Sequence, residues 1–233
     1  ADNNTAVGHY ALVANTTGHS NVAVGTYSLD AQTTGGYNTA VGYGALTANT
    51  TGEFNVAVGR NALSTATTAA GNTAVGDAAL ATSAGGNNTG IGYGSMYANT
   101  TGANNVAVGR EALESNTTAS NNTAVGYKAL EANTTGSENV AVGTSTLAAN
   151  TTASNNTGLG YAVLLANTTG AHNVGIGVNV LQANTTADDN VAVGRNALLA
   201  NTTGASNTAI GSRALDANTT GAGCVAIGAS ALS

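Results

Sequence analysis

The chain has 233 residues, a formal net charge of −6 at pH 7 and only 7% charged residues, while 42% are apolar and 32 are glycine. Five Lys and Arg residues cannot neutralise a track of phosphates, which argues against a nucleic-acid-binding protein. No apolar run approaches the roughly 20 residues of a membrane-spanning helix, and the single Cys224 excludes an internal disulfide framework.

One short sequence recurs along the whole chain, as in NTAVGYGALTANTTG at 38–52 and NVAVGRNALLANTTG at 190–204. We number each copy from its leading residue, which is repeat position 0. Position 0 is Asn in thirteen copies and Cys224 in the fourteenth, and the spacing is 17 residues except for a 16-residue step from Asn72 to Asn88. In the short copy we expect the missing residue to fall after Gly86, in a loop. A fixed period is the mark of a solenoid, so we predict a single repeat domain of fourteen copies over 1–233.

The first element predicted in each copy is a strand at repeat positions 1 to 3. Position 1 is Thr or Val, position 2 is Ala or Gly, and position 3 is Val in nine copies, Ile in four and Leu in one. This alternation indicates a strand whose positions 1 and 3 share one face, and we expect that face to point inward. The predicted strands are 5–7, 22–24, 39–41, 56–58, 73–75, 89–91, 106–108, 123–125, 140–142, 157–159, 174–176, 191–193, 208–210 and 225–227.

Glycine follows every predicted strand, at position 4 of all fourteen copies. A position that admits only glycine needs a positive φ or a very close backbone approach, so we expect the chain to turn here. Position 8 is Leu in thirteen copies and Met96 in the other, and it is expected to return to the interior. The segment from position 5 to position 10 is too short for its periodicity to exclude one turn of helix.

The last predicted element is a second turn at positions 11 to 14, which read Asn-Thr-Thr followed by Gly or Ala in most copies. Stacked copies would pair as parallel strands, and Asn at positions 0 and 11 would form amide ladders. The predicted fold class is therefore all-β, a β-solenoid of about fourteen 17-residue coils. Because position 1 alternates Thr and Val over most of the chain, a 34-residue coil is the alternative. We expect the shorter coil, in which Asn38 neighbours Asn55.

The predicted interior of each coil is small. One branched aliphatic residue, one Leu and a few alanines are available to each copy. Burying one such side chain contributes only about 1.5–3 kcal/mol, whereas ordering each residue costs about 1–2 kcal/mol for the backbone alone. We therefore expect several chains to associate, as a homotrimer or, through the open ends of the stack, as a head-to-tail filament.

The repeat resembles known fibre proteins. NVAVG followed by a small residue and Leu resembles the SVAIG…A repeats in the heads of YadA-type trimeric autotransporter adhesins. The longer unit NTAVGYGALTANTTG is similar to repeats in bacterial and phage fibres that end in an endosialidase-type chaperone domain. The resemblance covers all fourteen copies. It implies a left-handed β-roll, three chains side by side, and a role in attachment at a cell surface or as a virion fibre.

Residues that carry out catalysis or bind metals are scarce. The adjacent Asp188 and Asp189 are not repeated in any other copy, as a Ca²⁺ site built from the repeat would require. The GIGYG sequence at 90–94 lacks the Lys and the helix of a phosphate-binding loop. Three histidines fall at variable repeat positions and are interpreted as surface residues: His9, His19 and His172. We expect no catalytic residue, no metal site, no cofactor and no enzymatic activity.

Two further motifs have plain structural interpretations. Asn-Thr-Thr matches the N-glycosylation acceptor pattern about ten times, but the turn already requires these residues. Cys224 stands in the predicted Asn ladder and is interpreted as a buried, inert thiol rather than a cross-link between chains.

Position 5 provides the strongest candidate for a binding surface. Stacked coils would place its Tyr and Arg residues in one line, and both residue types are enriched at recognition sites and at subunit interfaces. We favour contact between chains over binding of a separate ligand. The residues are Tyr43, Arg60, Tyr93, Arg110, Tyr127, Tyr161 and Arg195.

Two functions remain open from the sequence. The first is a structural extracellular fibre or adhesin rod that assembles with itself and contacts a cell-surface or glycan target. The second is ice binding, since a weakly charged, Thr-rich solenoid suits that task. Two features oppose it: neighbouring threonines on a strand face opposite ways, and positions 11 to 14 form a turn rather than a plane. The threonine column in question is Thr16, Thr50, Thr100, Thr134, Thr168 and Thr202.

Overall fold

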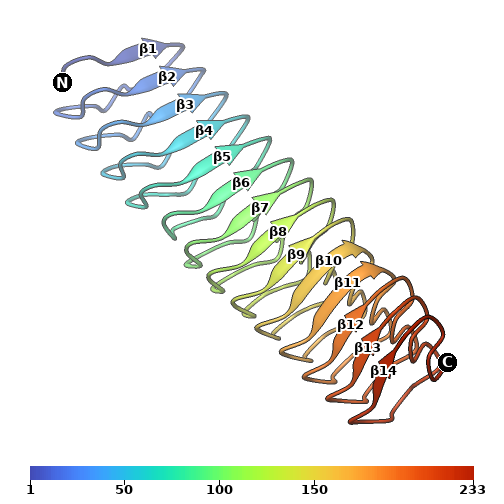
Figure 1. Ribbon diagram of the computed structural model, residues 1–233. Helices are drawn as coiled ribbons and strands as arrows, with labels where there is room; N and C mark the ends of the chain where they lie inside the picture. The colour runs from blue at the N-terminus through green and yellow to red at the C-terminus, as the bar shows by residue number, and fades with distance from the viewer. The chain divides into compact units, whose positions relative to one another are not determined.

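The computed structural model of the protein describes residues 1–233 and consists of strands and turns without a helix. Fourteen strands occur, one in each repeat, which confirms the all-β solenoid (Figure 1). They are β1 (Thr5–Val7), β2 (Val22–Val24), β3 (Thr39–Val41), β4 (Val56–Val58), β5 (Thr73–Val75), β6 (Thr89–Ile91), β7 (Val106–Val108), β8 (Thr123–Val125), β9 (Val140–Val142), β10 (Thr157–Tyr161), β11 (Val174–Val178), β12 (Val191–Val193), β13 (Thr208–Ile210) and β14 (Val225–Ile227).

The chain divides into two compact units, Ala1–Ser120 with β1 to β7 and Asn121–Ser233 with β8 to β14. Within each unit every strand pairs in parallel with the strand of the next repeat, and the coils lie one on another in sequence order (Figure 1). Thr39, Ala40 and Val41 of β3, for example, pair with Val56, Ala57 and Val58 of β4. The prediction of one uninterrupted repeat domain over the whole chain stays a prediction.

The coil has 17 residues, as predicted, and not 34. The backbone N–H of Asn38 donates to Asn21 Oδ1 at 2.9 Å, and Asn38 Oδ1 accepts from the N–H of Asn55 at 3.0 Å. The neighbours of Asn38 are therefore the leading Asn residues of the adjacent repeats.

The short repeat keeps the strand register, because Thr73 of β5 pairs with Thr89 of β6. The expected place of its missing residue was wrong. Asn72 Nδ2 donates to the carbonyl of Gly85 at 3.1 Å, a bond that other repeats form to the residue at position 14. Ala84 has the backbone bond typical of position 12, so the deleted residue is the exposed one at position 13, between Ala84 and Gly85.

The glycine at position 4 has both properties that the sequence predicted. Gly42 has a φ of 137°, and a Cβ added to it would lie 2.5 Å from the carbonyl oxygen of Gly59 in the next coil. A side chain is therefore excluded by backbone strain and by the backbone of the neighbouring coil. This position brings successive coils into close contact at the end of each strand.

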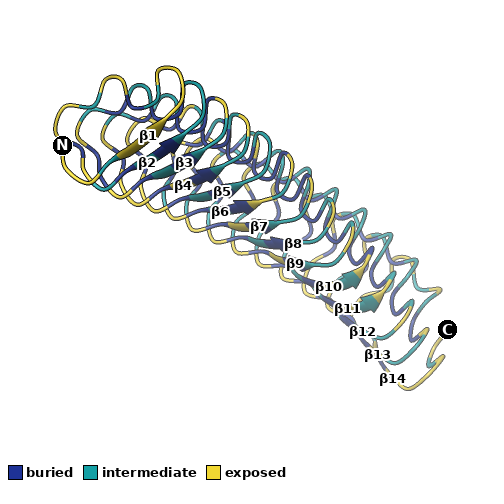
Figure 2. Cartoon of the chain, turned by 90° about the horizontal axis from the view of Figure 1, so that it is seen from above, coloured by how far each residue is buried: buried dark blue, intermediate teal, exposed yellow.

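The strand face that points inward is the opposite of the one expected from the sequence. Position 2 is fully buried in most strands, as at Ala57 and Ala124, while positions 1 and 3 lie partly or largely exposed on the outer face. In Figure 2 the pattern of buried and exposed segments recurs from coil to coil within each unit. The interior is too narrow for a Val on the strand, because Leu at position 8 already fills it from the other side.

The returning segment is a turn and not a helix. Positions 7 and 8 are adjacent and both buried, as in Ala62 and Leu63, which an extended strand cannot achieve. Positions 6 and 8 have positive φ in every coil, with values of 54° at Asn61 and 52° at Leu63. A left-handed residue costs roughly 1–2 kcal/mol, which the burial of Leu, at about 1.5–3 kcal/mol, offsets. The backbone N–H of Leu63 also donates to Ala79 of the next coil at 3.0 Å.

Side-chain sizes at positions 2 and 7 are matched across the core. Position 2 is Gly in three repeats, at Gly90, Gly158 and Gly175, and larger side chains than Ala stand beside them at position 7. A Cβ on Gly175 would lie 2.5 Å from Val163 Cγ1 and 3.5 Å from Val180 Cγ1. The glycine therefore makes room for a second branched residue in the same layer of the core.

Two ladders of buried Asn side chains connect the coils, as predicted. At position 11, Asn167 Nδ2 donates to Asn150 Oδ1 of the preceding coil at 3.0 Å and to Gly170 O of its own turn at 2.8 Å. At position 0, Asn173 Nδ2 donates to Ala187 O at 2.8 Å, and its Oδ1 accepts the N–H of Asn190 at 3.0 Å. These amides satisfy the backbone of the turns, which would otherwise be buried without partners.

Candidate interaction surfaces

The outer face of the sheet carries the first and third residues of every strand. These residues are Thr, Val, Ile or Leu in all fourteen strands, so no charged side chain lies among them. Val56 is 36% exposed, Val106 37% and Val140 38%. Val56 and Val140 have this exposure although each lies on a strand that is paired on both sides. Each unit thus presents an uncharged, largely apolar strip on the outside of its strands. Sequence reasoning missed this surface because it placed the same residues in the core.

The ridge predicted at position 5 lies beside this strip. In β10 and β11 the strand continues past the glycine to position 5, so that Tyr161 and Val178 follow the outward Leu159 and Ile176. In the first unit the backbone N–H of Asn61 donates to Tyr43 O at 2.8 Å, and that of Ala78 donates to Arg60 O at 2.9 Å. These bonds place the position 5 residues of successive coils next to one another.

In the first unit the ridge contains Tyr43, Arg60, Tyr93 and Arg110, as predicted, with Asp77 between Arg60 and Tyr93. Arg60 Nε and one terminal nitrogen donate to the two carboxylate oxygens of Asp77 at 3.1 and 2.8 Å. This hydrogen bond raises the pKa of Arg60 and lowers that of Asp77. The guanidinium of Arg110 lies 5.5 Å from the ring centre of Tyr93, in a cation–π arrangement.

In the second unit the ridge is less continuous. Tyr127 is accompanied by Lys128, whose Nζ lies 5.6 Å from the Tyr127 ring centre and 2.7 Å from Glu131 Oε1. Tyr161 is 57% exposed, and Val178 separates it from Arg195 in the following coils. The structure therefore aligns the seven predicted residues within their units, but it brings only some of them into contact through their side chains.

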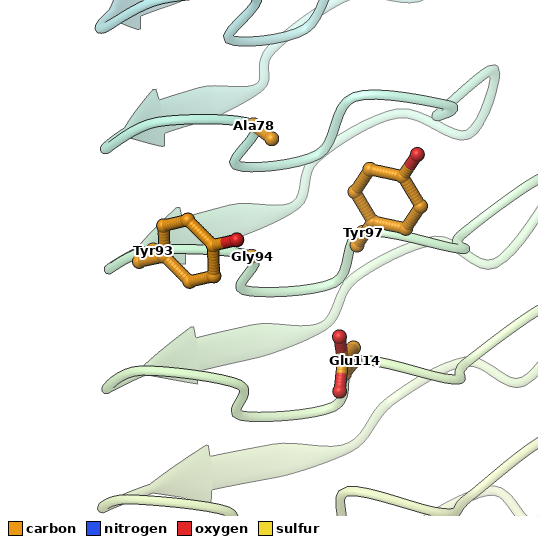
Figure 3. Close-up of a pocket in the computed structure, with 5 residues that line it drawn as sticks. All are labelled: Ala78, Tyr93, Gly94, Tyr97 and Glu114. Carbon is orange, nitrogen blue, oxygen red and sulfur yellow. The ribbon is translucent and has the colours of Figure 1, made fainter.

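A shallow hollow of about 220 Å³ lies next to the ridge of the first unit. Tyr93 and Tyr97 stand at its sides, the small Ala78 and Gly94 leave its space open, and Glu114 lies at its rim (Figure 3). It exists because position 6 is Ala or Gly in two successive coils while positions 5 and 9 of one coil are both Tyr. The hollow belongs to the same exposed side of the coil as the ridge.

Two aromatic stacks were missed in the sequence. Tyr10 and Tyr27, at position 6, have ring centres 5.5 Å apart and nearly parallel planes. Tyr37 and Phe54, at position 16, stack at 5.1 Å. The signal that could have revealed both stacks is the repeat itself, because aromatic residues 17 positions apart become neighbours in a 17-residue coil.

The threonines at positions 12 and 13 have different roles. The position 12 hydroxyl donates to the position 12 carbonyl of the next coil, as from Thr50 to Thr67 at 3.0 Å and from Thr168 to Thr185 at 3.1 Å. The residue at position 13, such as Thr51 or Thr169, is exposed. The hydroxyls of the threonine column considered for ice binding therefore donate hydrogen bonds within the chain. This holds for Thr16, Thr100, Thr134 and Thr202.

The remaining candidates have structural roles. Asp188 Oδ1 accepts the N–H of Ala171 at 2.7 Å, and Asp189 Oδ1 lies 3.7 Å from His172 Nδ1. The Asn of the glycosylation pattern is fully buried at Asn49 and at most of its equivalents, where it is not open to a glycosyltransferase, whereas Asn15 and Asn218 near the two ends of the chain are half-buried. Cys224 is half-buried rather than buried, and its N–H continues the position 0 ladder by donating to Asn207 Oδ1 at 2.9 Å.

No helix in the structure has the length and apolar character needed to cross a membrane. Comparison with protein-family models, curated proteins and solved structures found no match to this chain.

Proposed function

We propose that this chain is a structural, self-associating part of an extracellular fibre or adhesin, without a catalytic role. In this proposal several copies pack side by side through the outer faces of their sheets. The observation that carries it is the uncharged strip at positions 1 and 3 of every strand. A contiguous exposed apolar surface on a protein is typical of a contact with another protein.

The small core supports the same conclusion. Every coil except the last buries one Leu or Met at position 8, together with small residues such as Ala and Ser and, in two coils, one Val. When a second copy packs against the outer sheet face, the outer Val and Ile side chains become buried, and the apolar surface buried per coil increases although the coil stays the same size. Each such side chain contributes up to about 1.5–3 kcal/mol when it is fully buried.

The ridge at position 5 fits the rim of this contact. Tyr and Arg are the residues enriched at subunit interfaces, and Tyr43, Tyr93 and Tyr161 are each more than half exposed. Three copies are the number that the resemblance to trimeric adhesins implies. The ridge and its hollow remain accessible for a target on a cell surface, of which a glycan is one class.

The test places one charge on the outer face of each unit, in the variant Val58→Glu/Val125→Glu. A carboxylate buried between chains without a partner strongly disfavours association. We expect the unchanged protein to have a native mass that is a multiple of 22.4 kDa, and the variant to have the mass of one chain.

The matched control is Thr51→Glu/Thr135→Glu, which adds one charge to each unit at exposed position 13, away from the strip. It should assemble as the unchanged protein does. Circular dichroism of all three proteins checks that the β-solenoid is retained. An outer-face variant that assembles like the control would contradict the proposal.

Ice binding is the second candidate, and the structure supplies an observation in its favour. The turn at positions 11 to 14 is curved, which opposes ice binding there. The outer sheet face instead carries two rows of side chains on paired strands, including Thr123 and Thr157. An ice-binding face must be exposed, so this function and lateral self-association compete for one surface. A freezing-point gap abolished by Thr123→Tyr/Thr157→Tyr would favour ice binding. We expect no gap.

A further inference from the structure

The outer sheet face carries a pattern that its apolar character alone does not require. Position 3 is aliphatic in every strand, but position 1 changes between Thr and Val. In the first unit the order is Thr5, Val22, Thr39, Val56, Thr73, Thr89 and Val106. In the second it is Thr123, Val140, Thr157, Val174, Val191, Thr208 and Val225. Each unit therefore alternates strictly except at one pair, Thr73 with Thr89 or Val174 with Val191.

The hydroxyls of these threonines are unused within the chain. The position 12 threonines donate to the next coil, as Thr134 does to Thr151 O at 3.0 Å, whereas the outward Thr39, Thr73 and Thr157 form no side-chain hydrogen bond. Their backbone N–H groups are bonded normally, as Thr39 N is to Asn55 O at 2.8 Å. A hydroxyl that becomes buried against another surface needs a partner on that surface.

We infer that the Thr and Val pattern at position 1 fixes the axial register of neighbouring copies of this chain. The inference rests on the proposed side-by-side packing and adds what determines its alignment. When parallel copies lie level, each Thr faces the same Thr of its neighbour, whose hydroxyl can donate to it or accept from it. Each Val then faces a Val.

A displaced copy loses this match. A shift by one coil puts most threonines opposite valines, which leaves buried hydroxyls without partners. If Thr and Val alternated without exception, a shift by two coils would again place every Thr opposite a Thr and every Val opposite a Val. The repeated Thr73 and Thr89 in the first unit, and the repeated Val174 and Val191 in the second, prevent this match by creating mismatches.

The register decides the kind of assembly. Copies related by rotation about a common axis lie level and form a closed oligomer, whereas staggered copies leave free surface at both ends and continue into open fibres. Polar residues at single core positions select register and oligomer state in coiled coils in a comparable way. The pattern thus favours a closed assembly over a laterally staggered one.

The test is an inverse variant in which Thr and Val are exchanged at position 1 of all fourteen strands. Thr and Val remain the only residue types on the outer face at this position, and the inverse chain matches other inverse chains at every level. Alone, it should form the same oligomer as the original protein. Mixed with the original, each Thr would face a Val.

The two chains are denatured together, one of them labelled with ¹⁵N, then refolded and weighed by native mass spectrometry. We expect homo-oligomers only, with mixed oligomers at least tenfold below the statistical proportion. A statistical mixture would overturn the register inference while leaving self-association intact. A monomeric original protein would instead overturn the proposed function.

A second measurement covers the case in which the inverse chain does not fold. In a Cys224→Ser background, chains with Val75→Cys and chains with Val108→Cys are mixed and oxidised. The two positions are two coils apart, about 9.6 Å along the stack, and this exceeds the Cα separation of a disulfide. Level packing gives cross-links only between identical positions. Cross-links between position 75 of one chain and position 108 of another at comparable yield would overturn the inference.

Discussion

Each Asn at repeat position 11 has its side-chain amide committed to two other groups. Asn184, for example, donates to Asn167 Oδ1 at 2.9 Å and to Ala187 O at 3.1 Å. The ladder is interrupted in the first unit, where position 11 includes Gln32 and Ala66. Asn49 Oδ1, on the side of Ala66, is buried without a partner. This unpaired buried oxygen makes the ladder less stable at Ala66 than between two coils that both have Asn at position 11.

Restoring the amide should stabilise the protein. In Ala66→Asn the new side chain can donate to Asn49 Oδ1 and to the carbonyl of Ala69, as its equivalents do in other coils. We expect the free energy of unfolding to rise by about 0.5–1.5 kcal/mol, measured by urea denaturation.

The matched change runs in the opposite direction. Asn167→Ala removes the donor to Asn150 and Gly170 and the acceptor for Asn184, all of them buried. It should lower the free energy of unfolding by about 1–3 kcal/mol. If Ala66→Asn did not raise the free energy of unfolding and Asn167→Ala did not lower it, the ladder would not stabilise the fold.

Backbone strain at position 6 gives a second prediction at this scale. Ala78 has a φ of 56° and Gly94, its equivalent in the next coil, has a φ of 62°. A left-handed Ala costs roughly 1–2 kcal/mol, which exceeds the roughly 0.5–1 kcal/mol of chain entropy that Gly adds to the cost of folding. We expect Ala78→Gly to raise the melting temperature and Gly94→Ala to lower it.

The control separates strain from steric conflict. A Cβ on Gly94 meets no atom closer than 4.0 Å, whereas a Cβ on Gly42 would lie 2.5 Å from a backbone oxygen of the next coil. Gly42→Ala should therefore destabilise far more than Gly94→Ala. Similar melting temperatures for these two variants would contradict the assigned role of position 4.

At the scale of the strand, the sequence correctly predicted where each strand lies but not which side faces inward. Alternation of side chains establishes two faces, and the branched aliphatic residues were assigned to the interior because such residues are usually buried. The structure reverses this, because Leu63 and its equivalents cross the interior and leave room only for Ala or Gly on the strand. The signal in the sequence was the restriction of position 2 to the two smallest residues.

The size match between positions 2 and 7 gives the prediction at this scale. In Gly175→Ala the new Cβ would lie 2.5 Å from Val163 Cγ1, so overpacking should cost about 1–3 kcal/mol. Val163→Ala alone leaves a cavity and should cost a similar amount.

The double variant Gly175→Ala/Val163→Ala restores the Ala and Ala combination found between successive coils elsewhere, such as Ala57 with Ala45 of the preceding coil. Its loss of unfolding free energy, measured with denaturant, should be smaller than the sum of the single losses by about 1 kcal/mol or more. Additive losses would mean that the two positions do not share one space.

At the scale of the whole molecule, the repeat predicted stacking but could not predict the surfaces that stacking creates. The ridge at position 5 was predictable because it needs only the 17-residue period, which aligns residues such as Tyr43 and Arg60. The contacts of Arg60 with Asp77 and the hollow beside Tyr93 depend on particular neighbours and side-chain conformations. The apolar strip depended on which side of the strand faces outward, a choice that alternation alone cannot make.

Side-by-side association through the outer sheet face is the central claim, and the native mass of the unchanged protein tests it most directly. Sedimentation equilibrium at micromolar concentration should give a single species whose mass is a whole multiple of 22.4 kDa, with three chains as the expected number. A well-folded protein that sediments as one 22.4 kDa chain over this concentration range would contradict the account.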